Sequence, residues 1–226
     1  MGDGLESLPF NEWVAHVFDH DVREPSWYFD MDAPVWEGPA TLTLDHVTRL
    51  FKDPVDHLAR YSDAQLNQGF WYLVGESGST HMHALSDLSA PLEPRIRCVR
   101  SFSPLFEQLF AVRCSSHSSH LIHVRPPDFN PLNFACYMWW DIIPFAGDPA
   151  DPAHRDLDAA ALGVMEEILS IESLPCRESA LHGLGHWQHA YPRAVEAIID
   201  RALTKSAAWP RELKTYALNA KSGCIL

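Results

Sequence analysis

The spacing of apolar residues in the C-terminal third of the chain restricts the fold more than any other sequence feature. Beyond Pro192 the apolar residues at positions i, i+3, i+4, i+7 and i+8 are Val195, Ile198, Ile199, Ala202 and Leu203. These positions share one face of an α-helix. The same spacing predicts further helices along the chain, and no stretch keeps the period-two alternation of a half-buried strand. The sequence therefore predicts an all-α fold.

Length and composition predict a single all-α domain. The 226 residues are 46% hydrophobic and 21% charged, which is typical of a globular protein with a sizeable core. The residues up to about 143 form an irregular helical part with proline-broken helices. From about 153 onward the helices become regular, so a subdivision into residues 1–143 and 153–226 is one expectation. Within the first part, LNFACYMWWDII is apolar on all sides and predicts a helix that is buried on every face.

Several sequence features favour a cytoplasmic location. No run of about 18 apolar residues exists that would span a bilayer. The opening MGDGLESLPF has neither the basic start nor the apolar core of a secretory signal. The five cysteines are odd in number and none forms a CxxC pair, which is typical of reduced thiols. We expect a cytoplasmic protein without a membrane partner.

The formal net charge of −13 is distributed unevenly along the chain. Residues 1–60 carry 12 acidic and 4 basic side chains. A chain this acidic, without a long basic stripe, is not typical of proteins that bind nucleic acid or anionic membranes. We expect a protein partner, and its contact surface should be basic.

The segment CRESALHGLGHWQHAYPRAVEAIIDRALTK resembles a HEAT-like helical repeat. The resemblance rests on Ala-Leu-x-x-Leu-Gly in a first helix, a short turn, and Ala-Val-x-x-Ile-Ile in a second helix. It covers about 30 residues and implies antiparallel helix pairs stacked into an α–α superhelix with a concave binding surface. The whole chain also resembles a group of uncharacterised bacterial proteins, which implies no activity. The HEAT resemblance implies a compact helical body that ends in such pairs.

One helix of this segment places four potential metal ligands on one face. Glu178, His182, His186 and His189 are spaced so that they fall within about 80° of one another on a helix surface. Imidazoles at i and i+4 bind a divalent metal ion together, and a carboxylate or a third histidine completes the shell. The alternative is a polar face, opposite Leu184, that is wet or touches a neighbouring repeat. Other histidine sets, such as His117, His120 and His123, favour structural or solvated roles.

A proline-rich, aromatic and acidic segment follows the first predicted helix. It is EPSWYFDMDAPVWEGPA, and we expect it to form an ordered loop packed on the helical body. Its candidate ligand or partner residues are Trp27, Tyr28, Asp30, Asp32 and Trp36. Such rings line a groove in some proteins, but clustered rings in a helical domain also form core. Both alternatives stay open from the sequence.

No motif assigns a catalytic mechanism to this chain. The sequence lacks a glycine-rich phosphate loop, a G-x-S-x-G elbow and a Rossmann fingerprint. We therefore predict no catalytic residues and no obligatory cofactor. The sequence favours a non-catalytic binding or scaffold protein with a helical-repeat surface. The alternative is a metal-binding protein or metal-dependent enzyme that uses the His182, His186 and His189 face.

Overall fold

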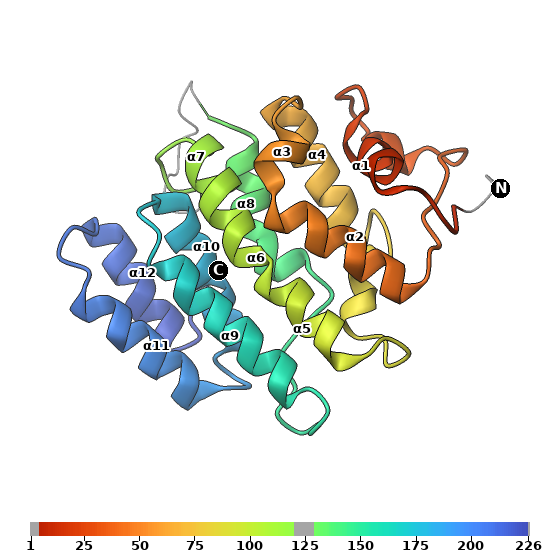
Figure 1. The fold of residues 1–226 in the computed structure, drawn as a ribbon. Helices are drawn as coiled ribbons and strands as arrows, with labels where there is room; N and C mark the ends of the chain where they lie inside the picture. Colours follow the sequence, from red (N-terminus) through yellow and green to blue (C-terminus); the bar gives the residue numbers. More distant parts are fainter. Residues whose placement is uncertain (1–4, 120–128, 226) are drawn as a thin grey trace.

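The computed structural model describes residues 5–119 and 129–225, which are helices and connecting loops without a strand (Figure 1). The α-helices are α1 (Phe10–Phe18), α2 (Ala40–Lys52), α3 (Pro54–Leu58), α4 (Asp63–Val74), α5 (Leu92–Arg100), α6 (Phe102–Leu105), α7 (Ala111–Arg113), α8 (Leu132–Ile142), α9 (Arg155–Leu169), α10 (Leu174–Trp187), α11 (Pro192–Thr204) and α12 (Arg211–Lys221). Two 3-10 turns, η1 (Trp27–Phe29) and η2 (His81–Leu85), and a π-helical turn, η3 (Phe106–Phe110), complete the elements. The predicted all-α fold is confirmed. None of the described helices is long and apolar enough to cross a membrane.

Local sequence signals set where several helices begin. At the start of α4, the Ser62 hydroxyl accepts a hydrogen bond from the Gln65 backbone N–H at 3.2 Å, and the Gln65 side chain accepts one from the Ser62 N–H at 3.1 Å. This capping box satisfies backbone donors that have no partner within the helix. Helices α10 and α11 have Pro175 and Pro192 in their first turns, where the missing N–H costs nothing.

The longer helices lie in two rows. In one row α2, α5, α9 and α11 are successive neighbours, and Figure 1 shows them running side by side in the same direction. In the second row α1 contacts α4, α4 contacts α8, and α10 lies between α8 and α12. Contacts of α9 with α10 and of α11 with α12 join the rows. One cluster of buried apolar residues extends from Phe10 to Ala220, across the predicted boundary near residue 143, and the subdivision at that boundary stays a prediction.

Trp139 on α8 lies at the centre of the aromatic core. It is fully buried, and the centroid of its ring system lies 5.5 to 5.8 Å from those of five phenylalanines. These are Phe51, Phe70, Phe102, Phe106 and Phe110. The steep angles between the rings are the edge-to-face arrangement that aromatic quadrupoles favour. This cluster joins α2, α4, α6 and η3 to α8.

The prediction that α8 is buried on every face is wrong in detail. Phe134 and Asp141, seven residues apart, are exposed on one side of the helix. Helices α4 and α10 and the η3 turn pack against α8. Residues separated by about two turns share a face of a helix. Phe134 and Asp141 therefore lie on the one narrow strip of α8 that these elements leave uncovered. Asp141 thereby reaches the surface from within the most apolar segment of the chain.

The aromatic loop packs on the body, as predicted, and its two tryptophans belong to the core. Trp27 and Trp36 are buried. The Trp36 indole donates a hydrogen bond to the Thr43 hydroxyl at 2.9 Å, and its ring stacks on His81 with 7° between the planes. Tyr28 is half-buried against this core. Of the two alternatives for the tryptophans, core is therefore the observed one, because the large apolar area of both rings is buried.

Candidate metal centre

Helix α10 is buried on almost all sides, so its polar residues Glu178 and His182 contact other parts of the chain and not water. Every residue from Glu178 to Gly185 is buried, and the His182 side chain is among them at 3% exposure. Helix α10 lies between α8 and α12 in its row and also contacts α9 and α11. Two glycines permit this close packing. A Cβ atom on Gly183 would lie 2.5 Å from the Cγ of Trp140, and one on Gly185 would lie 2.5 Å from a side-chain carbon of Ile225.

Of the four predicted ligands, the structure brings His182 and His186 together. Their Nε2 atoms lie 3.1 Å apart, as expected for residues one turn apart on a helix. Glu178 is fully buried, and its carboxylate accepts a hydrogen bond from the Ser119 backbone N–H at 2.7 Å. His189 lies beyond the end of α10 and is exposed. The group of potential ligands found among the described residues contains neither Glu178 nor His189.

The third member of this group is Asp141, on α8. One of its oxygens lies 3.2 Å from the His186 Nε2 atom, and one potential ligand atom from each of Asp141, His182 and His186 lies within 4.8 Å of the others. The sequence prediction missed Asp141 because it searched along one helix, whereas this carboxylate comes from the neighbouring helix. A signal was present, since Asp141 is the single charged residue of an otherwise apolar helical run.

Two tyrosines surround the buried side of the group. The hydroxyl of Tyr216, on α12, lies 2.7 Å from the Nδ1 atom of His182, and the ring of Tyr137 is 4.4 Å from the imidazole. Burial raises the pKa of the Tyr216 hydroxyl, and proximity to Tyr137 and Glu178 raises it further. Burial also raises the pKa of Tyr137. Both phenols are therefore neutral at physiological pH, and Tyr216 fixes the orientation of the His182 ring.

The open side of the group faces solvent. The side chains of His186 and Asp141 are 41% and 39% exposed, whereas His182 is buried at the base. The His186 Nε2 atom lies close both to an Asp141 oxygen, at 3.2 Å, and to the His182 Nε2 atom, at 3.1 Å. The three residues form a group that could hold a metal ion.

The other histidines form no such group in the described part of the chain. His20 hydrogen-bonds the backbone carbonyl of His16, and the Nε2 atom of His16 lies 2.9 Å from the Tyr72 hydroxyl. Burial, with a smaller effect of His20, lowers the pKa of His16 to about 4. These rings are structural at neutral pH. His120 and His123 lie outside the described residues.

Among the predicted partner residues of the aromatic loop, the acidic ones reach the surface. Asp30 and Asp32 are exposed, and Asp30 forms an ion pair with Arg23 at 3.4 Å. Between the two acids, the Met31 side chain is 94% exposed, and Phe29 is 55% exposed. The loop thus combines a buried aromatic side with an exposed side that is acidic and apolar.

Comparison of the chain with protein-family models, with curated proteins and with solved structures gives no match. The function therefore has to be inferred from the geometry of this protein's own side chains.

Proposed function

We propose that this protein binds a divalent transition-metal ion through His182, His186 and Asp141. The separations of the ligand atoms, 3.1 Å between the two imidazole nitrogens and 3.2 Å between nitrogen and carboxylate oxygen, carry the proposal. Metal–ligand bonds of about 2.0–2.2 Å place neighbouring ligand atoms about 3.0 Å apart at octahedral angles and about 3.4 Å apart at tetrahedral angles. These two separations fall within that interval, and the ligand atoms of His182 and Asp141 lie within 4.8 Å of each other.

The type of ligand narrows the choice of metal and the kind of site. Two imidazoles and one carboxylate are a ligand set used for zinc and for non-haem iron(II), whereas calcium and magnesium prefer oxygen ligands alone. Three protein ligands leave at least one coordination position for water or another ligand, and the exposed sides of His186 and Asp141 place that position at the surface. With its Nε2 atom bound to the metal ion, His182 would donate its Nδ1–H to the Tyr216 hydroxyl, which is the outer-shell support common in such sites.

Zinc titration of untagged protein tests the proposal. We expect one zinc ion to bind per chain by calorimetry and to raise the melting temperature, because a ligand that binds only the folded state stabilises it. His186→Ala and Asp141→Asn should each weaken zinc binding about 100-fold or more, since loss of an outer-shell partner alone costs 10–100-fold. His189→Ala is the matched control, because His189 lies near the site but outside the ligand group, and it should bind zinc like the wild type.

Both exposed ligands can be replaced without loss of core packing, so the test does not depend on a buried substitution. Cobalt(II) in place of zinc adds a visible absorption spectrum that reports the coordination number. Zinc binding that is equally strong in His186→Ala, Asp141→Asn and the wild type contradicts the proposal. So does untagged protein that binds no zinc, nickel or manganese and whose melting temperature these ions leave unchanged.

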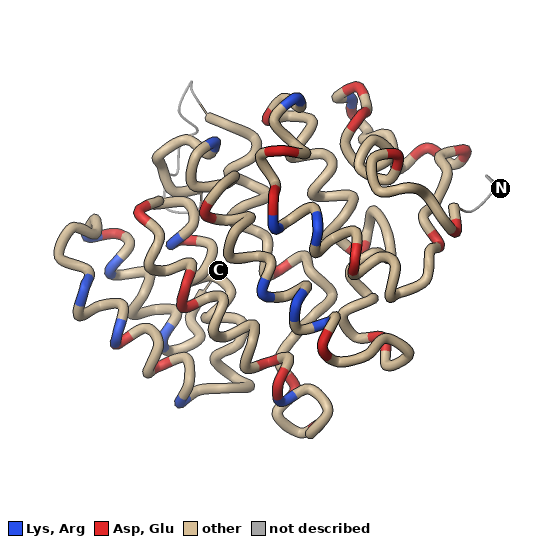
Figure 2. Tube along the Cα trace, in the orientation of Figure 1, with Lys and Arg blue, Asp and Glu red and all other residues tan. Residues whose placement is uncertain are grey.

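A second function, a protein-binding scaffold, is favoured by the two rows of helices. Successive helices alternate between the rows over much of the chain, α9 and α11 in one row and α10 and α12 in the other. We propose that these helices are HEAT-like pairs of an α–α superhelix, an architecture that is used for binding extended partners. The partner surface is the exposed side of the aromatic loop, formed by Phe29, Asp30, Met31 and Asp32. Figure 2 shows acidic residues gathered around this end of the molecule, so the partner is a protein with a basic surface.

Cross-linking in native lysate tests the scaffold function. We expect a reproducible protein partner whose capture decreases as salt is raised, because salt screens exposed charges. The double variant Asp30→Asn/Asp32→Asn and the variant Met31→Ser should each reduce capture. Val112→Ser, which removes another exposed apolar side chain, on α7, should not. A partner that these loop variants capture as well as the wild type, or the absence of any partner, contradicts this function.

A further inference from the structure

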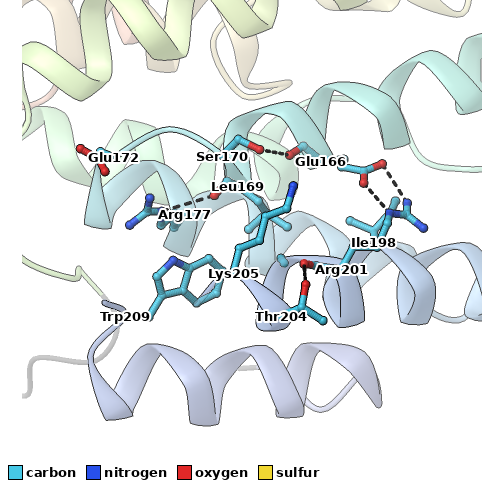
Figure 3. A pocket seen from close by; sticks show the side chains of 11 residues that line it. Glu166, Leu169, Ser170, Glu172, Arg177, Ile198, Arg201, Thr204, Lys205 and Trp209 are labelled. Carbon is cyan, nitrogen blue, oxygen red and sulfur yellow. Dashed lines mark hydrogen bonds and ion pairs between the residues drawn. The ribbon is translucent and has the colours of Figure 1, made fainter. Parts of the chain in front are cut away.

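A pocket of about 360 Å³ opens at the far end of α10 from the candidate metal centre. It lies between the C-terminal ends of α9 and α11, the first turns of α10 and the turn that precedes α12 (Figure 3). Its apolar surface includes Leu169, Ile198 and Trp209. This volume suits a small molecule. Three basic and two acidic side chains also line the pocket, so one positive charge is left in excess.

One of the three cations is already neutralised within the protein. Arg201 donates two hydrogen bonds to the two carboxylate oxygens of Glu166, at 2.7 and 2.9 Å. This bidentate pair, which Figure 3 shows at one side of the pocket, lowers the pKa of the Glu166 carboxyl group. The ligand-binding capacity of the pocket therefore rests on the two other cations.

Arg177 is held in place while much of its donor capacity stays available. Its Nε atom donates a hydrogen bond to the Leu169 carbonyl at 3.3 Å, and its guanidinium carbon lies 5.4 Å from the centre of the Trp209 ring. No carboxylate of the described residues lies within ion-pair distance of it. Partial burial lowers the pKa of Arg177, and the smaller opposite effects of Glu172 and Cys176 do not offset it. An anion beside the guanidinium would supply the missing compensation.

Two further donors face the same pocket. The Trp209 side chain lines the pocket, and its indole N–H forms no hydrogen bond within the described residues and is not one of their fully buried atoms. Figure 3 shows the indole nitrogen on the ring edge that faces Arg177. Lys205, at the end of α11, is exposed, and its ammonium group likewise has no ion-pair partner in the described structure. The Trp209 N–H is therefore available to donate a hydrogen bond to a molecule bound in the pocket.

We propose that this pocket binds a small monocarboxylic acid with an apolar body. The carboxylate accepts hydrogen bonds from Arg177 and from the Trp209 N–H, with Lys205 nearby, and the apolar body packs against Leu169 and Ile198. A single negative charge matches the single positive charge in excess, whereas a phosphate dianion would leave one negative charge unbalanced. The pocket is a local exception in an acidic protein, since residues 192–226 carry six basic and three acidic side chains (Figure 2).

Spectra of ¹⁵N-labelled protein test this proposal without any assay of activity. The eight tryptophans give separate indole N–H signals, and Trp209→Phe identifies that of Trp209. N-acetylphenylalanine should shift the Trp209 signal saturably. N-acetylphenylalaninamide, which has the same body without the charge, should leave it unchanged. Arg177→Gln and Lys205→Gln should each weaken binding about tenfold, as expected for loss of a charge-assisted hydrogen bond.

Arg193→Gln is the matched control, because Arg193 is an exposed cation on α11 outside the pocket, and it should bind the acid like the wild type. Lys205→Gln keeps the test valid even if Arg177→Gln affects folding, since Lys205 is exposed. Equal shifts with the acid and the amide overturn the proposal, as does the absence of a shift at millimolar acid. Tighter binding of phenyl phosphate than of the acid overturns the assignment to carboxylates. Undiminished binding in both pocket variants overturns the assigned position.

Discussion

Trp139→Ala should lower the free energy of unfolding by about 3–5 kcal/mol, the range for truncation of a large aromatic side chain in a core. Trp139 is fully buried and contacts five phenylalanines that belong to α2, α4, α6 and η3. The substitution removes the transfer free energy of the indole and leaves a cavity that rigid rings from several helices refill poorly. Because a typical domain is stable by about 5–15 kcal/mol, urea unfolding curves should show a large shift of the midpoint.

Phe134→Ala is the matched control on the same helix. Phe134 lies on the exposed strip of α8, so its truncation should cost about 1 kcal/mol or less. The difference between the two losses of unfolding free energy therefore tests which face of α8 is buried. Equal losses in the two variants would show that the face assigned to the core is wrong.

His182→Ala and Leu184→Ala should both destabilise the protein, although one replaces a polar residue and the other an apolar residue. Leu184→Ala should cost about 2–5 kcal/mol through lost transfer free energy and a residual cavity. His182→Ala should cost about 2 kcal/mol, because it removes a buried ring together with its hydrogen bond to Tyr216. Denaturant unfolding of metal-free protein gives both values without a contribution from bound metal.

His189→Ala should stay within about 0.5 kcal/mol of the wild type, since His189 is exposed beyond the end of α10. Together, the three variants show whether α10 is buried on most sides or has one polar face in water. If His182→Ala were as neutral as His189→Ala, the polar residues of α10 would face water and the packing of α8 and α12 around this helix would be wrong.

Much of the fold could be predicted from the sequence because local physics decides it. The apolar spacing in residues 192–203 places Val195, Ile198 and Ile199 on one face, and these three residues are the buried ones of α11. The Ser62–Gln65 capping box forms as its spacing predicts. Each of these signals acts over one or two helical turns. Over that distance the spacing of residues in the sequence fixes their relative positions in space.

The burial of α10 and of the aromatic loop could be predicted only in part. The sequence of α10 places polar and apolar residues on opposite faces, which predicts a polar side that is wet or touches a neighbouring repeat. In the structure α8, α9 and α12 surround this helix, and Gly183 and Gly185 permit the close contacts. A helix in the middle of a row is enclosed by its neighbours whatever its own polarity, so the number of neighbours decides its burial.

By itself, the sequence determined the helical class, the positions of several helix starts and the pairing of His182 with His186, because these depend on contacts within a few residues. Only the tertiary structure added Asp141 to that pair and moved Glu178 and His189 out of it. The pocket around Arg177 and Trp209 is likewise visible only in the folded chain. Both sites join side chains from different helices, and their convergence depends on how helices pack, which no periodicity along a single helix encodes.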